Sequence, residues 1–134
     1  MSASTVGAGQ LVLIVEDDRS TLALLAQLLR QAGFRVTTAS DPMQGFACAV
    51  RERPAVVISD MRMPAGGGDT LLRRLQASNR TSDIPVVVVS ASIGPEERDR
   101  LLSTGVAAVL AKPVEGPSLV AAVVAAIGRE APGS

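Results

Sequence analysis

The chain has 134 residues, enough for one domain with its own hydrophobic core, and its 13 basic and 13 acidic residues balance, which argues against a strongly positive nucleic-acid surface. It contains no histidine and one cysteine, so serine–histidine and cysteine–histidine catalysis, histidine metal sites and an internal disulfide are excluded. Two phenylalanines are the only aromatic residues, and no apolar run approaches the roughly 18 residues of a membrane span, so neither base stacking nor a membrane partner is expected.

The first elements follow a short polar start. Residues 1–10 lack the basic region and the apolar core of an export signal, and we expect them to be a disordered lead-in. Residues 11–15 predict a first buried strand. The leucine-rich stretch after it predicts a helix that is capped by Asp18 or Ser20 and ends near Ala32.

A second strand and helix come next. Residues 35–39 alternate and are β-branched, which indicates a strand that suits an edge of the sheet. Asp41 and Pro42 supply an N-cap and a first helical residue for a helix that stops before Pro54. Cys48 lies in this helix, and we expect a small buried hydrophobe rather than a reactive thiol.

In the middle of the chain a short apolar run ends abruptly in a carboxylate. Residues 55–60 predict a strand buried on both faces, with Asp60 at or just past its carboxyl end. Glycines 66–68 predict a loop, residues 69–78 a third helix and residues 84–89 a fourth strand.

The last third of the chain continues the alternation. Residues 94–105 predict a short helix whose early acids suit its N-terminal dipole, and residues 107–111 predict a fifth strand. Residues 116–127 predict a last helix, and residues 128–134 indicate a frayed tail. Five strands therefore alternate with five helices, which is typical of an α/β fold with a parallel sheet covered by helices on both faces.

Chemically active side chains gather at the predicted carboxyl ends of the strands. Because these ends share one edge of a parallel sheet, residues far apart in the sequence converge there. They are Glu16, Asp17 and Asp18 after the first strand, Asp60 at the third, Ser90 after the fourth and Lys112 after the fifth.

This set of groups suits phosphoryl chemistry. Clustered carboxylates repel one another unless they share a proton or bind a divalent cation, and with oxygen ligands alone Mg²⁺ is the natural cation. Lys112 is the only lysine among 13 bases, and its ammonium together with the Ser90 hydroxyl suits the oxygens of a phosphoryl group. The combination predicts an aspartyl-phosphate site.

Four motifs in this order resemble the receiver domain of two-component signalling, of the response-regulator, chemotaxis type. They are Val15-Glu16-Asp17-Asp18, Ile58-Ser59-Asp60-Met61-Arg62-Met63-Pro64, Val89-Ser90-Ala91 and Lys112-Pro113. The resemblance extends over residues 11–127 and implies a flavodoxin-like, doubly wound (βα)5 fold with strand order 2-1-3-4-5. It also implies a signalling switch rather than a metabolic enzyme.

The resemblance implies a role for each group that meets the phosphoryl. Asp60 would be the phosphoacceptor, attacking the phosphohistidine of a histidine kinase or of a phosphotransfer protein. Ser90 would hydrogen-bond the phosphoryl group and carry the switch, and Lys112 would pair with the phosphoryl group or with Asp60. In the family, a cis peptide commonly precedes the residue that corresponds to Pro113.

The resemblance also implies a Mg²⁺ site. Asp17 would be a direct ligand and Glu16 would act partly through water, while Asp60 and the backbone carbonyl of Arg62 would complete the protein ligands. The Arg62 side chain would face the mouth of the site and tune the lifetime of the phosphoryl group.

Several of these residues have a plainer interpretation. We expect Asp18 to be a helix cap or first-turn residue rather than a ligand. Glu16 and Asp17 would be solvated loop acids if Asp60 and Lys112 were absent, and the plainer interpretation of Ser90 is an ordinary serine at a strand end.

Other functions compete with this one. A Mg²⁺-dependent phosphohydrolase that works through an aspartyl phosphate commonly carries a second acid two residues after its nucleophile, where this chain has Arg62. The chain lacks the glycine motif that a nucleotide-binding module of this fold would carry. A degenerate receiver that serves only for docking would not need the intact set of site residues. We expect the chain to be a stand-alone regulator or relay, or the receiver piece of a larger hybrid kinase or regulator.

Two departures from the family pattern affect the output of the switch. Val109 stands three residues before the lysine, where the family usually has Tyr or Phe, so rotation of an aromatic ring cannot operate here. Gly67 and Gly68 replace the usual Asp-Gly and make the loop after Asp60 more permissive in conformation.

The last helix carries a separate prediction. Residues 119–127 are apolar nearly all round, which predicts an interaction surface for a second copy of the chain or for another protein. Simple exposure of its alanines is the plainer interpretation. The downstream protein is unknown from the sequence, and we expect a cytoplasmic location.

Overall fold

The computed structural model describes residues 9–62 and 67–128, and within them the predicted strands and helices are all present. Residues 1–8, 63–66 and 129–134 lie outside the described residues, and with them most of the predicted disordered lead-in over residues 1–10 and of the predicted tail over residues 128–134. The elements are β1 (Leu11–Val15), α1 (Arg19–Gln31), β2 (Arg35–Ala39), α2 (Pro42–Glu52), β3 (Val56–Asp60), α3 (Gly67–Ala77), β4 (Val86–Ser90), α4 (Pro95–Ser103), β5 (Ala108–Ala111) and α5 (Gly116–Gly128).

The strands form one parallel five-stranded sheet in the order β2-β1-β3-β4-β5, as the resemblance implied. β2 lies at an edge, which confirms the prediction for residues 35–39. The central strands β1, β3 and β4 are buried along almost their whole length, because helices cover both faces and apolar side chains can point to either side.

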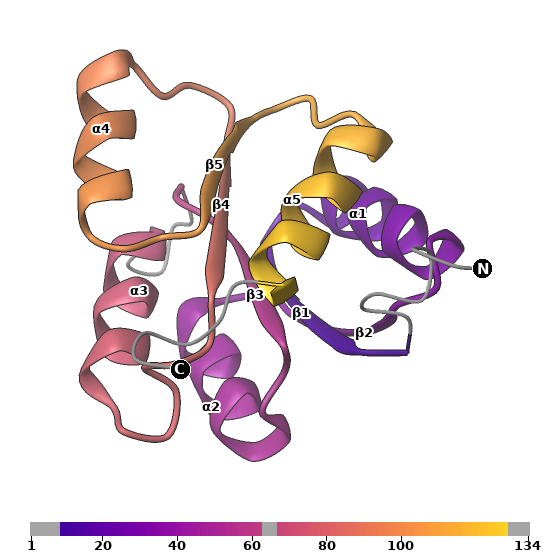
Figure 1. Ribbon diagram of the computed structural model, residues 1–134, viewed down its shortest axis with the longest axis horizontal. Coiled ribbons are helices and arrows are strands. Elements are labelled where there is room, and N and C mark those ends of the chain that lie inside the picture. Colours follow the sequence, from indigo (N-terminus) through magenta and orange to yellow (C-terminus); the bar gives the residue numbers. More distant parts are fainter. Residues whose placement is uncertain (1–8, 63–66, 129–134) are drawn as a thin grey trace.

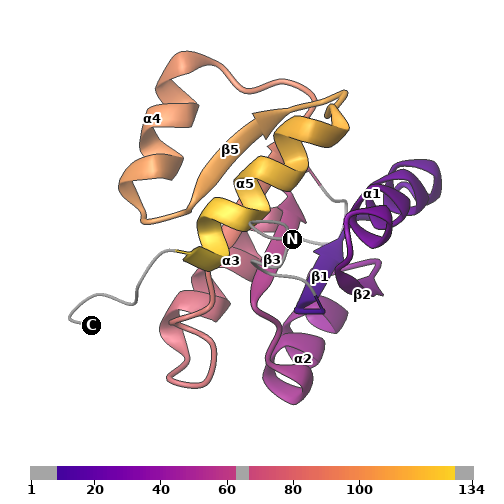
Figure 2. The same ribbon diagram turned by 45° about the vertical axis from the view of Figure 1, so that its right-hand side comes forward.

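Helices cover the two faces of the sheet in two groups (Figure 1, Figure 2). α1 and α5 pack on one face, where Leu25, Leu29 and Leu119 join the apolar side chains of the central strands. α2, α3 and α4 lie on the other face, where Leu71 and Leu101 belong to a second buried cluster. The sheet is therefore a rigid layer whose carboxyl edge is open to carry a site.

Local signals in the sequence explain where several helices begin and end. Asp18 is the N-cap of α1, and its carboxylate accepts a hydrogen bond from the Thr21 N–H at 2.8 Å, which confirms its predicted role as a cap. Asp41 caps α2 in the same way through the Gln44 N–H. After α1, Gly33 adopts a φ of +101°, a conformation that favours glycine.

Two elements, α3 and β4, start two residues away from their predicted positions. α3 begins at Gly67, so that Gly67 and Gly68 lie in its first turn and not in a loop. Asp69 stands in that turn, where its negative charge is favoured by the helix dipole, and this explains an earlier start than the glycines indicated. β4 covers 86–90 rather than 84–89, so that Ser90 is the last residue of the strand itself.

Gly45 allows α2 to lie close to the first strand. A Cβ built on it would stand 2.8 Å from a methyl group of Val15, which is β-branched and cannot turn away easily. The close approach holds α2 against β1 one residue before Glu16. Cys48 on the same helix is 4% exposed, and burial raises the pKa of its thiol, as expected for an unreactive core residue.

The exposed surface of α5 is less apolar than the sequence indicated. Leu119, Val123 and Ala126 are buried, and Val124 is partly buried against the same cluster. The exposed positions within 119–127 are occupied by alanines. An interface through this helix therefore stays a prediction.

Within the described residues, no helix combines the length and the apolar character that a membrane crossing needs.

Candidate functional site

The carboxyl ends of four strands meet at one edge of the sheet. Val15 lies beside Ser59, Asp60 beside Val89, and Ser90 beside Ala111 in the strand register. Because the strands are parallel and end at nearly the same level, the residues that end or follow them are brought together. The edge predicted from the sequence is therefore formed.

Three carboxylates converge at this edge. Glu16, Asp17 and Asp60 each offer an oxygen, and these oxygens lie within 4.8 Å of one another. Glu16 is 1% exposed and Asp60 4%, whereas Asp17 is exposed. Asp18 turns away as the cap of α1, although its backbone N–H donates to Glu16 at 3.1 Å.

This donor set fits a hard divalent cation. All three side chains offer carboxylate oxygens, which Mg²⁺ prefers, and two buried acids so close together repel each other unless a positive charge lies between them. The exposed position of Asp17 leaves one side of the cluster open to water, which Mg²⁺ typically retains in its shell. The residues present therefore fit the Mg²⁺ ion that the resemblance implied.

Lys112 supplies a positive charge to the two buried acids. Its Nζ lies 2.8 Å from Oε1 of Glu16 and 3.4 Å from Oδ2 of Asp60, although 96 positions separate Lys112 from Glu16 in the chain. Burial raises the pKa of Glu16, while the hydrogen bond from Lys112 opposes this shift. Burial alone would lower the pKa of Lys112, but its contacts with both acids raise it, so the ammonium form is stabilised.

Asp60 is held in place from two sides. Its Oδ1 accepts a hydrogen bond from the Arg62 N–H at 3.1 Å, and its Oδ2 faces the ammonium of Lys112. The backbone carbonyl of Arg62 as a metal ligand stays a prediction. The Arg62 guanidinium donates to the carbonyl of Ser92 at 3.1 Å and so joins the loops that follow β3 and β4. Sequence reasoning missed this link, because no local pattern pairs these two residues.

Ser90 ends β4 with a hydroxyl that is fully buried. The residue is 0% exposed, and its Oγ has no hydrogen-bond partner within the described part of the chain. A buried hydroxyl without a partner is unfavourable, so such a group in a native fold calls for an explanation. A ligand that accepts a hydrogen bond from Ser90 at this edge would supply one.

We expect Ser90→Ala to raise the free energy of unfolding by about 1 kcal/mol, because the substitution removes a buried polar atom that has no partner. Urea denaturation of the ligand-free protein measures this. Ser59→Ala is the matched control, since Ser59 is 3% exposed but its hydroxyl donates to the Asp60 carbonyl at 3.2 Å, and we expect that variant to lose stability. Equal losses in both variants would contradict the interpretation of Ser90.

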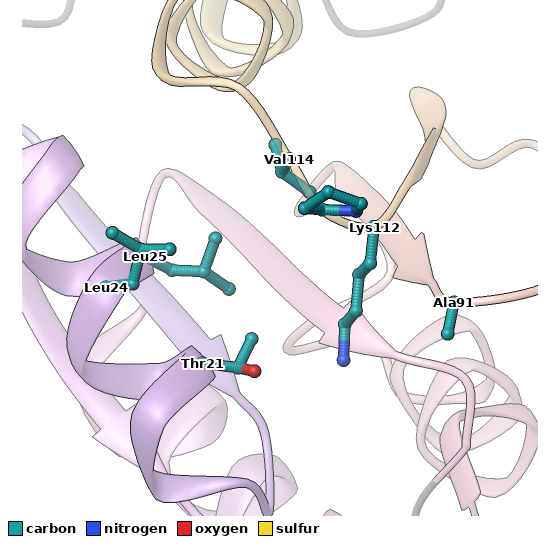
Figure 3. A pocket seen from close by; sticks show the side chains of 7 residues that line it. Thr21, Leu24, Leu25, Ala91, Lys112 and Val114 are labelled. Atoms are coloured by element: carbon teal, nitrogen blue, oxygen red, sulfur yellow. The ribbon is translucent and has the colours of Figure 1, made fainter.

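A cavity of about 320 Å³ opens beside Lys112, between α1 and the segment that follows β5 (Figure 3). Thr21, Leu24 and Leu25 line it from α1, and Lys112 and Val114 line it from the opposite side. Leu24 is 48% exposed. Leu24 lies off the leucine stripe of α1, and this was the sequence signal for the cavity. Sequence reasoning missed the cavity. The peptide between Lys112 and Pro113 is cis, as the resemblance implied.

Comparison with known proteins gives one consistent result. The family model described as "Response regulator receiver domain" matches residues 12–124. The transcriptional regulatory protein PrrA of Mycobacterium tuberculosis is 36% identical over 118 residues, which cover 88% of this chain and 50% of PrrA. The chain thus spans about half the length of this curated relative.

Solved structures agree with the sequence match. The receiver domain of the sensor histidine kinase PA1611 from Pseudomonas aeruginosa PAO1 is 30% identical, with a TM-score of 0.83 and coverage of 91% of this chain and 100% of that one. That structure is described as holding a magnesium ion coordinated in the active site cleft. The chemotaxis protein CheY4 of Vibrio cholerae is 27% identical, with a TM-score of 0.79 and coverage of 85% and 95%.

Proposed function

The chain belongs to the response regulator receiver domain family, and from this premise we propose that Asp60 accepts a phosphoryl group in a Mg²⁺-dependent reaction and that the phosphorylated form signals through a changed surface. The observation that carries the assignment is the convergence of two further carboxylates, those of Glu16 and Asp17, and the only lysine of the chain on the buried Asp60. The buried, unpartnered hydroxyl of Ser90 at the end of the next strand supports it.

The donor is a phosphohistidine of another protein, because this chain has no histidine of its own. A carboxylate oxygen of Asp60 attacks the phosphorus, the bond between phosphorus and the donor's imidazole nitrogen breaks, and the imidazole leaves with the bonding electron pair. The Lys112 ammonium and the Ser90 hydroxyl donate hydrogen bonds to phosphoryl oxygens, on which negative charge accumulates. Lys112 thereby exchanges its contact with Asp60 for one with the phosphoryl group.

The Mg²⁺ ligands would be the carboxylates of Glu16, Asp17 and Asp60 and the backbone carbonyl of Arg62. Bound Mg²⁺ supplies charge neutralisation for the acids and the phosphoryl oxygens. Glu16 holds Lys112 at 2.8 Å and so positions the ammonium next to the reacting oxygens. The Arg62 side chain, fixed to the Ser92 carbonyl, is expected to tune the lifetime of the phosphoryl group.

This function is a signalling role within two-component systems. We propose that a histidine kinase or a phosphotransfer protein donates the phosphoryl group and that an unidentified downstream protein responds to the phosphorylated chain. We propose the cytoplasm as the location. A second copy of the chain, bound through α5, is a further proposed partner. A phosphohydrolase is less well supported, because Arg62 replaces its second acid and directs its guanidinium to a backbone carbonyl.

We expect the chain to gain the mass of one phosphoryl group when it is incubated with a small phosphodonor and Mg²⁺. Excess chelator should reduce the labelled fraction at least about tenfold, because the clustered carboxylates then repel the incoming phosphoryl group. Intact-mass spectrometry measures both results. An absence of added mass in the presence of Mg²⁺ would overturn the proposed function, and labelling that is insensitive to chelator would overturn its metal dependence.

A further inference from the structure

α2 carries apolar side chains on two opposite sides. One stripe is buried against the sheet and consists of Pro42, Gly45, Cys48 and Ala49. A second stripe follows the helical spacing i, i+3, i+4, i+7 on the side that faces away from the sheet, and it consists of Met43, Phe46, Ala47 and Val50. Met43 is 73% exposed, the largest exposure of any large apolar side chain in the described residues. A helix that only covered the sheet would carry polar residues on this side.

Arg74 of α3 covers the ring of Phe46 in this second stripe. Its guanidinium carbon lies 4.7 Å from the ring centroid, which is within the range of a cation–π contact, and Arg74 is exposed. Phe46 is half-buried, since it also packs against the apolar cluster beneath α2 and α3. The two helices contact each other and lie side by side in Figures 1 and 2. Arg74 therefore places a positive charge at the edge of the apolar stripe.

The other charged groups around the stripe are mostly positive as well. Five arginines lie on α2, on α3 and in the turns that follow these helices, namely Arg51, Arg53, Arg73, Arg74 and Arg80. The two acids among them are already paired, Glu52 with Arg51 at 3.2 Å and Asp83 with Arg53 at 3.3 Å. The second pair joins the turn after α3 to the end of α2. Arg73, Arg74 and Arg80 have no acid within ion-pair distance in the part of the chain that the structure describes.

Helix stability explains only part of this arrangement. Arg51 and Arg74 stand in the last turns of their helices, where the helix dipole favours positive charge, and Asp41 caps the opposite end of α2. The dipole does not explain an apolar stripe that faces water, nor Met43 in the first turn of α2. An exposed apolar patch that is surrounded by polar residues marks an interaction site, and methionine, phenylalanine and arginine are enriched at such sites.

We propose that the second stripe of α2 and the five arginines form one docking surface, the α2–α3 surface, for an acidic amphipathic helix of another protein. Apolar side chains of that helix pack on the stripe, and its acids pair with Arg73, Arg74 and Arg80. A nucleic acid fits this surface less well, because its phosphates offer nothing to the apolar stripe and would meet Glu52 and Asp83 among the arginines. The docking surface lies on a face of the sheet and needs no chemistry at Asp60.

A fluorescently labelled synthetic peptide of about 15 residues is the probe for this surface. Its leucines follow one another at three- and four-residue spacing with glutamates beside them, so that it presents an acidic amphipathic helix. We expect fluorescence anisotropy to give a Kd of about 100 µM for the wild type, with weaker binding as the salt concentration rises. The affinity should fall about tenfold in Met43→Gln, which loses an apolar contact, and about fivefold in Arg74→Glu, which turns attraction into repulsion.

Each variant has a matched control away from the α2–α3 surface. Leu102→Gln removes an exposed apolar side chain from α4. Arg30→Glu reverses a charge in the last turn of α1, as Arg74→Glu does in the last turn of α3. We expect both controls to bind the peptide within about twofold of the wild type. Absence of binding to the wild type, or equal losses in the variants and their controls, would overturn the proposal. If circular dichroism shows that a variant is unfolded, Met43→Ala or Arg74→Gln replaces it, and wild-type affinity in that replacement also overturns the proposal.

Two further measurements separate this partner from other occupants. A labelled DNA duplex that binds as tightly as the peptide, with a loss in Arg74→Glu but none in Met43→Gln, would make the surface a general anion site and contradict the proposal. Sedimentation of the protein alone tests for a second copy, and a wild-type dimer that Met43→Gln abolishes would also contradict it. None of these experiments contains a phosphodonor, so their results are independent of the proposed function.

Discussion

Asp60→Asn is expected to gain no phosphoryl mass from a small phosphodonor and Mg²⁺, under conditions in which the wild type is labelled. The amide has nearly the shape of the carboxylate and can still accept the Arg62 N–H that Asp60 binds at 3.1 Å. It has no anionic oxygen to attack phosphorus, so labelling is lost because the nucleophile is missing and not because the fold is disturbed. Intact mass after equal incubation gives the labelled fraction of each protein.

Asp18→Asn is the control for this experiment. Asp18 stands two positions after Glu16, and its side chain caps α1. Asparagine caps helices about as well as aspartate, so we expect labelling within about twofold of the wild type. Equal labelling of Asp60→Asn and the wild type would place the phosphoryl group elsewhere in the chain. Loss of labelling in Asp18→Asn would show that general changes near the first strand are enough to abolish it.

The fold could be predicted because its signals are local. Continuous apolar runs predict strands that are buried on both faces, and Asp18 and Asp41 mark the starts of two helices by capping chemistry. The start of α3 was predicted wrongly, because three glycines in a row favour a loop on their own. The favourable charge of Asp69 in the first turn was the signal that should have weighed against this reading.

Which residues come together at the site could be predicted as well, because a parallel sheet brings the ends of its strands to one edge. The sequence could not predict which side chain of the site contacts which partner. Lys112 reaches both Glu16 and Asp60, and this depends on the exact path of a long side chain. The same holds for Arg62 on the Ser92 carbonyl and Arg98 on the Val109 carbonyl, since a backbone carbonyl carries no residue identity that a pattern could reveal.

Lys112→Met is expected to lower the free energy of unfolding at pH 7 by about 3 kcal/mol, because it leaves two buried carboxylates without their cation. Methionine keeps much of the apolar stem, so most of the loss comes from charge. Urea denaturation in the presence of chelator measures it, since bound Mg²⁺ would supply the missing charge. Arg53→Met is the control, because its exposed pair with Asp83 at 3.3 Å should contribute no more than about 1 kcal/mol.

The loss in Lys112→Met should depend on pH with a definite sign. Burial raises the pKa of Glu16 above its ordinary value of 4.5, so its ionised form lowers stability at neutral pH, and this effect disappears as the pH falls through the raised pKa. Lys112 opposes that shift, and its own raised pKa keeps it protonated at neutral pH. Without Lys112 the pKa of Glu16 rises further, so the difference between variant and wild type should be largest near pH 7 and shrink toward pH 4.5.

A second substitution identifies the group responsible. Glu16→Gln in the Lys112→Met background removes the buried charge that lost its partner, so it should recover a large part of the stability. The same substitution in the wild type should give no gain in stability, because Lys112 would then lose its ion pair with Glu16. If the double variant is as unstable as Lys112→Met and the loss does not change with pH, Lys112 stabilises the fold by packing and not by holding the acids of the site together.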